Sequence, residues 1–123
     1  MLPRPPSTVI INSAALIAGT ITTVILAAPG AGKAYRLLIW AAGIPRNPGA
    51  GAGVDFNLIE TGAGTRIWQL NGFSAASSSY FHVGWPVPGI LVTVNQGISA
   101  QAIATAAGGV ATYNLAYYID NIN

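Results

Sequence analysis

Hydrophobic and polar residues alternate along most of the chain, and this period of two is typical of β-strands with one buried face. Residues 53–58 show the alternation most clearly, because Val54, Phe56 and Leu58 fall on one face and polar residues on the other. Residues 65–70 repeat the pattern. We therefore predict a strand in each of these segments.

Further strands follow from the same pattern. Near the C-terminal end, alternate residues from Tyr113 to Ile119 share one face. Residues 35–40 are almost all aromatic or aliphatic, which predicts a strand buried on both faces. Other candidate strands lie at residues 7–13, 19–28, 78–84, 89–95 and 99–105. The alanine-rich residues 13–18 and 98–107 could instead form short helices.

Turn signals separate these segments. Proline and glycine at residues 29–32 and 86–89 suit tight turns, because proline presets φ and glycine permits positive φ. Asn71 followed by Gly72 predicts a hairpin turn, and the glycine-rich residues 47–53 predict a mobile surface loop. Eight or nine short strands at this spacing predict an all-β fold, an antiparallel β-sandwich that is jelly-roll-like.

The first seven residues differ from the rest. Three prolines remove backbone donors and favour an extended path, so this segment cannot enter the middle of a sheet. We expect an N-terminal arm at residues 1–7 and a single sandwich domain at residues 8–123. The arm is a candidate contact with a neighbouring subunit, through Leu2, Pro3, Arg4, Pro5 and Pro6.

The composition is unusually poor in charge. Charged residues make up 7% of the 123 residues and hydrophobic residues 52%, against about 25% charged residues in an ordinary soluble domain. So few charged side chains cannot cover a monomer of this size. We therefore expect much of the surface to be neutral or buried against other chains, so that the protein self-associates.

Composition also excludes several classes of protein. The absence of cysteine rules out disulfide scaffolds and thiol catalysis, and a net charge of +2 is not the footprint of a nucleic-acid-binding protein. The uncharged stretch between Arg4 and Lys33 is interrupted by Asn12 and several threonines, so we expect no transmembrane helix. The expected partners include neither nucleic acid nor membrane.

No set of residues predicts catalysis. Residues 30–33, Gly-Ala-Gly-Lys, lack the spacing of a phosphate-binding loop, which predicts a plain turn with Lys33 in solvent. Asp55, Glu60 and Asp120 form no evident acid–base pair and are expected to be solvated or ion-paired surface acids. His82 is the single histidine, so one chain cannot build a multi-histidine metal site. We expect no enzyme, metal or cofactor.

The tryptophans leave one alternative open. Trp40 and Trp68 lie in predicted strands, where packing in a core or interface is the common role. Trp85, next to Pro86 at a strand end, is the best candidate for an exposed contact and could help to bind a glycan. This possibility leaves a glycan-binding module open as an alternative.

Several of these segments together resemble small all-β virion proteins of tailed bacteriophages, the capsid decoration or cement proteins. The resemblance rests on the PGAGK turn at residues 29–33, the following strand with Arg36, the step from Gly84 to Trp85, and the strand at residues 89–94. It ends with a closing strand that contains spaced tyrosines, Tyr113 and Tyr117, and runs from about residue 20 to residue 119.

The resemblance implies a structural role. Proteins of this family bind the major capsid protein at the capsid surface, often as homotrimers, and stabilise the contacts between capsomers. By this resemblance the chain is made in the host cytoplasm and ends in the virion, with no cofactor, and the arm of residues 2–6 is a candidate contact with the capsid. The alternative is a phage tail, fibre or baseplate module that binds host glycan. A low-charge surface agrees with that role, since permanent interfaces are depleted in charge.

Overall fold

The computed structural model describes residues 8–17, 20–46, 53–74, 79–104 and 109–122, and these residues form strands and loops with no helix. The nine strands are β1 (Val9–Ile17), β2 (Thr20–Leu26), β3 (Lys33–Arg46), β4 (Gly53–Glu60), β5 (Arg66–Ser74), β6 (Ser79–Gly84), β7 (Ile90–Leu91), β8 (Ile98–Ala104) and β9 (Gly109–Asn121). The prediction of an antiparallel β-sandwich is confirmed.

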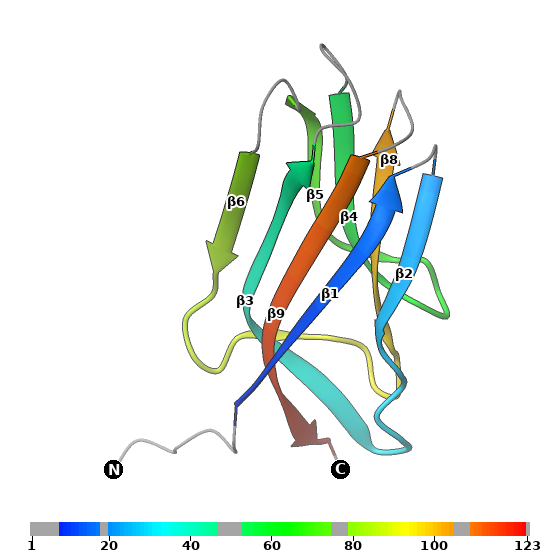
Figure 1. The fold of residues 1–123 in the computed structure, drawn as a ribbon. Helices are drawn as coiled ribbons and strands as arrows, with labels where there is room; N and C mark the ends of the chain where they lie inside the picture. Colours follow the sequence, from blue (N-terminus) through cyan, green and yellow to red (C-terminus); the bar gives the residue numbers. More distant parts are fainter. Residues whose placement is uncertain (1–7, 18–19, 47–52, 75–78, 105–108, 123) are drawn as a thin grey trace.

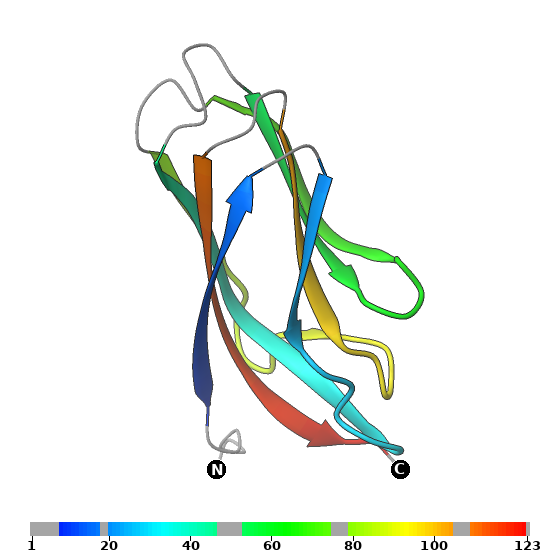
Figure 2. The ribbon, with the colours of Figure 1, turned by 45° about the vertical axis from the view of Figure 1, so that its right-hand side comes forward.

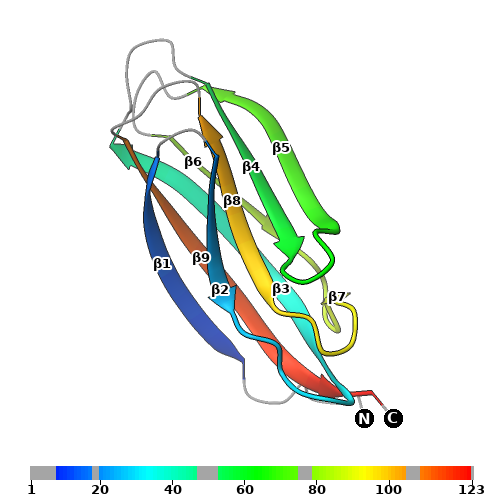
Figure 3. The same cartoon turned by 90° about the vertical axis from the view of Figure 1, so that its right-hand side faces the viewer.

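The strands pair in a nested order. In sheet A the order is β1-β9-β3-β6, with the short β7 also paired to β3, and in sheet B it is β2-β8-β4-β5. With β7 left out, the first strand pairs with the last, the second with the next to last, and so on inward to β4 and β5. The two sheets lie face to face, as the views in Figures 1 and 3 show.

One hydrophobic core fills the space between the sheets. Sheet A supplies Trp40 and Leu115, sheet B supplies Phe56 and Leu58, and all four side chains are fully buried. Aromatic contacts link the layers, because the Tyr113 ring is stacked on Trp40 with centroids 5.7 Å apart and meets Phe56 edge-on at 6.3 Å. The alternation predicted for residues 53–58 and for Tyr113 and Leu115 therefore describes the core faces correctly.

Two sequence predictions about individual segments are wrong, and one alternative is decided. Asn71 and Gly72 lie inside β5, where a register shift against β4 accommodates them as an irregularity of a strand that continues. The strand predicted at residues 99–105 is confirmed over the helical alternative, because β8 pairs along its length with both β2 and β4. The second wrong prediction concerns residues 35–40. Residues 35–40 are buried on one face only, since a register shift after Leu37 leaves Ile39 49% exposed.

The turn predicted at residues 29–32 is confirmed. Gly30 and Gly32 have positive φ angles of 114° and 73°, and the Lys33 N–H donates to the Gly30 carbonyl at 3.2 Å. Lys33 is exposed, as expected. The loop predicted at residues 47–53 falls almost wholly outside the described residues, which resume at Gly53.

Candidate interaction surface

The outer face of sheet A is the face that points away from the core, and the strand register builds it in rows. One row consists of Ile10, Ala116, Ile39 and Gly84, which are direct neighbours across β1, β9, β3 and β6. The adjacent row is formed by Asn12, Asn114, Ala41 and His82. None of these eight residues is Asp, Glu, Lys or Arg, so both rows are free of formal charge.

Large apolar side chains are exposed on this face. Ile10 is 70% exposed and Tyr80 is 65% exposed. Tyr80 lies across Gly43, its register partner in β3, so closely that a Cβ at residue 43 would be 1.9 Å from the ring. Glycine at residue 43 therefore lets an aromatic ring lie flat on the sheet. The result is a neutral surface of small and apolar groups, with high exposure at its two edges.

An ion pair marks one end of the outer face of sheet A. The Arg36 Nε atom lies 2.9 Å from the Asp120 Oδ2 atom, and both side chains are partly exposed. Next to it, the Tyr118 hydroxyl donates to the Pro88 carbonyl at 2.8 Å. Because the two charges neutralise each other, this end also contributes no net charge to the face.

The outer face of sheet B contains a polar row instead. Thr22, Gln101, Asn57 and Gln69 form a row across β2, β8, β4 and β5. The Asn57 side-chain amide donates to Gln101 Oε1 at 2.9 Å, and Gln101 Nε2 donates to Thr22 Oγ1 at 3.1 Å. Asn57 is only 2% exposed, so this amide row shields its own central member from solvent.

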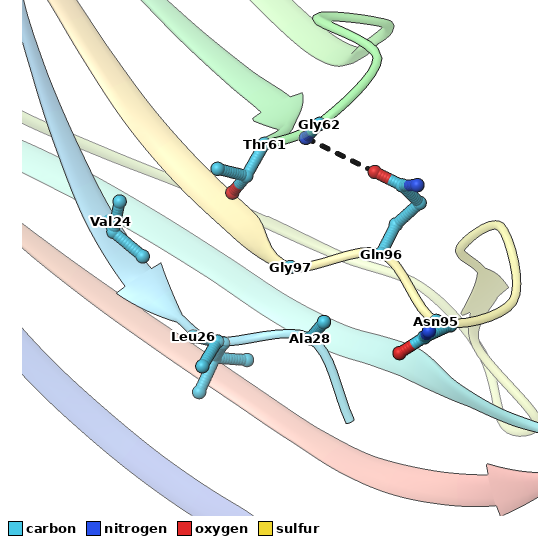
Figure 4. Close-up of a pocket in the computed structure, with 9 residues that line it drawn as sticks. Val24, Leu26, Ala28, Thr61, Gly62, Asn95, Gln96 and Gly97 are labelled. Carbon is cyan, nitrogen blue, oxygen red and sulfur yellow. Dashed lines mark hydrogen bonds between the residues drawn. The ribbon is translucent and has the colours of Figure 1, made fainter. Parts of the chain in front are cut away.

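A pocket lies at the end of the sandwich where β2 ends, between the β4–β5 turn and the loop before β8 (Figure 4). It encloses about 260 Å³, and its lining contains no charged side chain. Its amide groups are already used within the protein, because the Gly62 N–H donates to Gln96 Oε1 at 3.1 Å and the Gly30 N–H to Asn95 Oδ1 at 3.0 Å. These hydrogen bonds connect the loop before β8 to the β4–β5 turn and to the β2–β3 turn.

Glu60 corrects one sequence prediction. It is 5% exposed and therefore is not a solvated surface acid. Its carboxylate accepts a hydrogen bond from the Thr93 N–H at 2.7 Å, which fixes the loop before β8 to the end of β4. Because this buried carboxylate is paired with a backbone donor, the role of Glu60 is structural. Asp120, by contrast, is ion-paired as predicted.

The residues considered for catalysis do not come together. Asp120 lies in sheet A and pairs with Arg36, whereas Asp55 and Glu60 belong to β4 of sheet B. His82 is exposed on the face opposite to Phe81 and Val83, which pack against the core. Within the described ranges, no group of three or more His, Cys, Asp and Glu residues could hold a metal ion.

The tryptophans belong to the core more than to the surface. Trp40 is fully buried, and Trp68 and Trp85 are partly buried and pack against the core. The backbone N–H of Trp85 donates to the Leu38 carbonyl at 2.8 Å, which fastens the turn at residues 85–89 to β3. In the same turn, a Cβ at Gly89 would lie 2.4 Å from the Leu37 carbonyl oxygen, so only glycine fits there. An interface role for Trp85 stays a prediction.

Burial also changes the acidity of core tyrosines. It raises the pKa of Tyr113 to about 12, because the phenolate would lose its hydration in the core. Burial, followed by the neighbouring Tyr117, raises the pKa of Tyr35. Both tyrosines are therefore neutral at physiological pH and act as packing groups.

The predicted arm contact, from Leu2 to Pro6, lies outside the described residues. In the part of the chain that is described, no helix is long and apolar enough to cross a membrane.

Comparison with known proteins supports the architecture. No family model matches the chain, and no curated protein sequence matches it. Among solved structures, a chain of the cyanophage Pam1 capsid asymmetric unit is 19% identical with a TM-score of 0.53, over 96% of this chain and 92% of that chain. The likeness is one of fold.

Two further solved structures have lower TM-scores. A subunit of the disulfide-linked pili of Bacillus endospore appendages is 16% identical with a TM-score of 0.43, over 100% of this chain and 97% of that one. A chain of the extra small virus of the giant freshwater prawn Macrobrachium rosenbergii is 16% identical with a TM-score of 0.33, over 95% of this chain and 85% of that one.

Proposed function

We propose that the protein is a structural virion subunit that self-associates and binds a phage capsid shell, as decoration or cement proteins do. The observation on which this rests is the outer face of sheet A, where two complete rows across four strands are free of formal charge while Ile10 and Ile39 are exposed. Large neutral faces of this kind are typical of surfaces that other chains cover.

The fold gives independent support. The nested pairing of eight strands supports a jelly-roll arrangement, an architecture common in viral capsids. The likeness of fold to the Pam1 capsid chain extends over 92% of that chain. A small sandwich suits an accessory subunit that binds to a shell in many copies, where weak contacts add up.

The N-terminal arm is the proposed contact with the shell, and we expect a trimer as the assembled form. Prolines at positions 3, 5 and 6 favour an extended segment that loses little entropy when it lies along a neighbouring surface. Arg4 is the single charge in this arm and could pair with an acidic group of the major capsid protein.

Binding to capsid shells tests this function. Purified protein is mixed with shells assembled from the major capsid protein of the same phage, and bound copies are counted after sedimentation. We expect saturable binding of the full chain and clearly lower occupancy after deletion of residues 1–7, with an unchanged circular dichroism spectrum. Absence of binding by the full chain would contradict the function, and full occupancy by the truncated chain would contradict the role of the arm.

A further inference from the structure

The four edge strands of the sandwich differ in how well they are protected. Sheet A ends in β1 and β6, and sheet B ends in β2 and β5. An edge strand presents unpaired backbone N–H and C=O groups and can pair with another chain, unless it is short, charged, bulged or interrupted by proline.

Three of these edges are protected. β5 begins with Arg66 and has two register shifts against β4, and β2 has a register shift between Val24 and Leu26. β6 has six residues and is followed at once by a turn that contains Pro86 and Pro88. Each of these features shortens or bends the row of free backbone groups.

β1 has none of these protections. Its nine residues pair with β9 without any register shift, and they contain no charge and no proline. Val9 and Ile10 are exposed at its beginning. Within the described part of the chain, no backbone hydrogen bond outside the pairing with β9 reaches this strand. Figure 2 shows β1 at the margin of its sheet.

We propose that β1 pairs with β1 of a second copy of this chain, antiparallel and across a two-fold axis, so that two copies of sheet A become one continuous sheet. This inference rests on the self-association part of the proposed function and is independent of shell binding. A two-fold contact joins copies in pairs, so in a trimeric assembly it would join neighbouring trimers.

The sequence favours a second copy as the partner. In a two-fold pairing each strand lies against itself, and like charges placed opposite each other would oppose it. β1 contains no charge, so no such repulsion arises. The prolines at positions 5 and 6 also end the ladder of backbone hydrogen bonds shortly before Val9, at the same place in both copies.

Paired lysine variants test the contact by solution mass. Asn12 in β1 and Asn114 in β9 are direct register partners, and both are exposed. Asn12→Lys places a charge at the proposed junction, and Asn114→Lys places the same charge one strand inward on the same face. By sedimentation velocity we expect self-association of the full chain to weaken about threefold or more with Asn12→Lys and clearly less with Asn114→Lys, which lies on the same face but not at its β1 edge.

Single cysteines provide a second measurement that does not depend on those variants. The chain has no cysteine, so each disulfide between copies reports one engineered position. Cysteine is placed at Ile10, Asn12 or Ser13 in turn, with Asn114→Cys as the control. We expect one β1 position, the one nearest the axis, to give far more disulfide-linked dimer than the control on oxidation.

The possible failures are distinguishable. A full chain that stays monomeric at high concentration would overturn both this inference and the self-association part of the proposed function. Self-association that Asn114→Lys weakens as much as Asn12→Lys, or equal crosslinking at Asn114→Cys and at the β1 positions, would overturn the edge pairing alone. A monomeric Asn12→Lys variant that still binds shells would support the inference, because self-association would then depend on the β1 edge and shell binding would not.

Discussion

The two outer faces of the sandwich treat their polar groups in opposite ways. On sheet B, side-chain amides from neighbouring strands bond to one another, as Asn57, Gln101 and Thr22 do. On sheet A, one row consists of small and apolar residues and the next of Asn12, Asn114, Ala41 and His82, and Ile10 is among the most exposed side chains. The side-chain amides of sheet B therefore bond to one another, whereas sheet A leaves apolar side chains and its β1 edge exposed.

This difference shows how a sequence with 7% charged residues can fold. Neutral amides that bond to one another supply polar contacts without charge, as in the row of Thr22, Gln101 and Asn57 on sheet B. The other face gains little from water and more from contact with another chain. Both faces have low charge, but only one of them is suited to be covered.

The largest predicted effect tests whether the two sheets share one core. Phe56→Ala in sheet B and Trp40→Ala in sheet A each remove a fully buried aromatic ring. We expect each to lower the free energy of unfolding by about 3–5 kcal/mol, measured by urea denaturation, within a single transition. Two separate transitions would mean that the sheets unfold independently. Stability changes on the two outer faces could then not be compared within one folding unit.

A pH-dependent effect follows from the inner face of sheet A. The pKa of Tyr113 is raised to about 12 by burial, against about 10 in the unfolded chain. Stability is therefore unaffected below pH 10 and falls by about 1.4 kcal/mol per pH unit between pH 10 and pH 12, because the unfolded state loses its proton first. Urea titrations at pH 8, 10 and 11 should show a smaller fall for Tyr113→Phe than for the unchanged protein. Equal slopes would contradict the assignment.

A matched pair of asparagines sharpens the comparison of the outer faces. Asn57→Ala on sheet B removes the donor to Gln101 Oε1 from a buried position, and we expect a loss of about 1–2 kcal/mol of stability. Asn12→Ala on sheet A changes an exposed residue, and we expect a change within about 0.5 kcal/mol. Thermal denaturation of both variants measures the difference. Similar losses would mean that the faces do not differ in this way.

The smallest effect concerns the ion pair at the end of the outer face of sheet A. Arg36 and Asp120 are partly exposed, so Asp120→Asn should cost less than about 1 kcal/mol. The loss should shrink further in 1 M salt, where the charges are screened. Denaturation at low and high salt measures it. A large loss that does not depend on salt would show that the pair is structural rather than a neutral boundary of the face.

The sequence predicts the strands well because burial imposes a period of two wherever one face meets the core. Val54, Phe56 and Leu58 are all fully buried, as their spacing indicates. Local signals fail where pairing over long distances outweighs them. Asn71 and Gly72 favour a turn, yet β4 supplies partners on both sides of them, so β5 continues through an irregularity.

The surface is harder to predict than the core. The scarcity of charge indicates a neutral exterior, but the pattern of one strand cannot show which strands become edges or which rows align. Glu60 illustrates the limit, because its burial depends on the Thr93 N–H, which lies 33 residues away along the chain. The position of Trp85 is equally hard to predict, because its backbone N–H donates to the carbonyl of Leu38 in another strand, β3.

The position of β9 has a consequence for how the chain folds. This strand follows all the others in sequence, yet it lies between β1 and β3 in the interior of sheet A. Sheet A therefore cannot join β1 to β3 before β9 is in place. The partner of β1 lies about a hundred residues further along the chain. Folding should be slow and governed by this long-range closure. During synthesis, the segment that becomes β1 therefore has no strand to pair with in sheet A until β9 has been made.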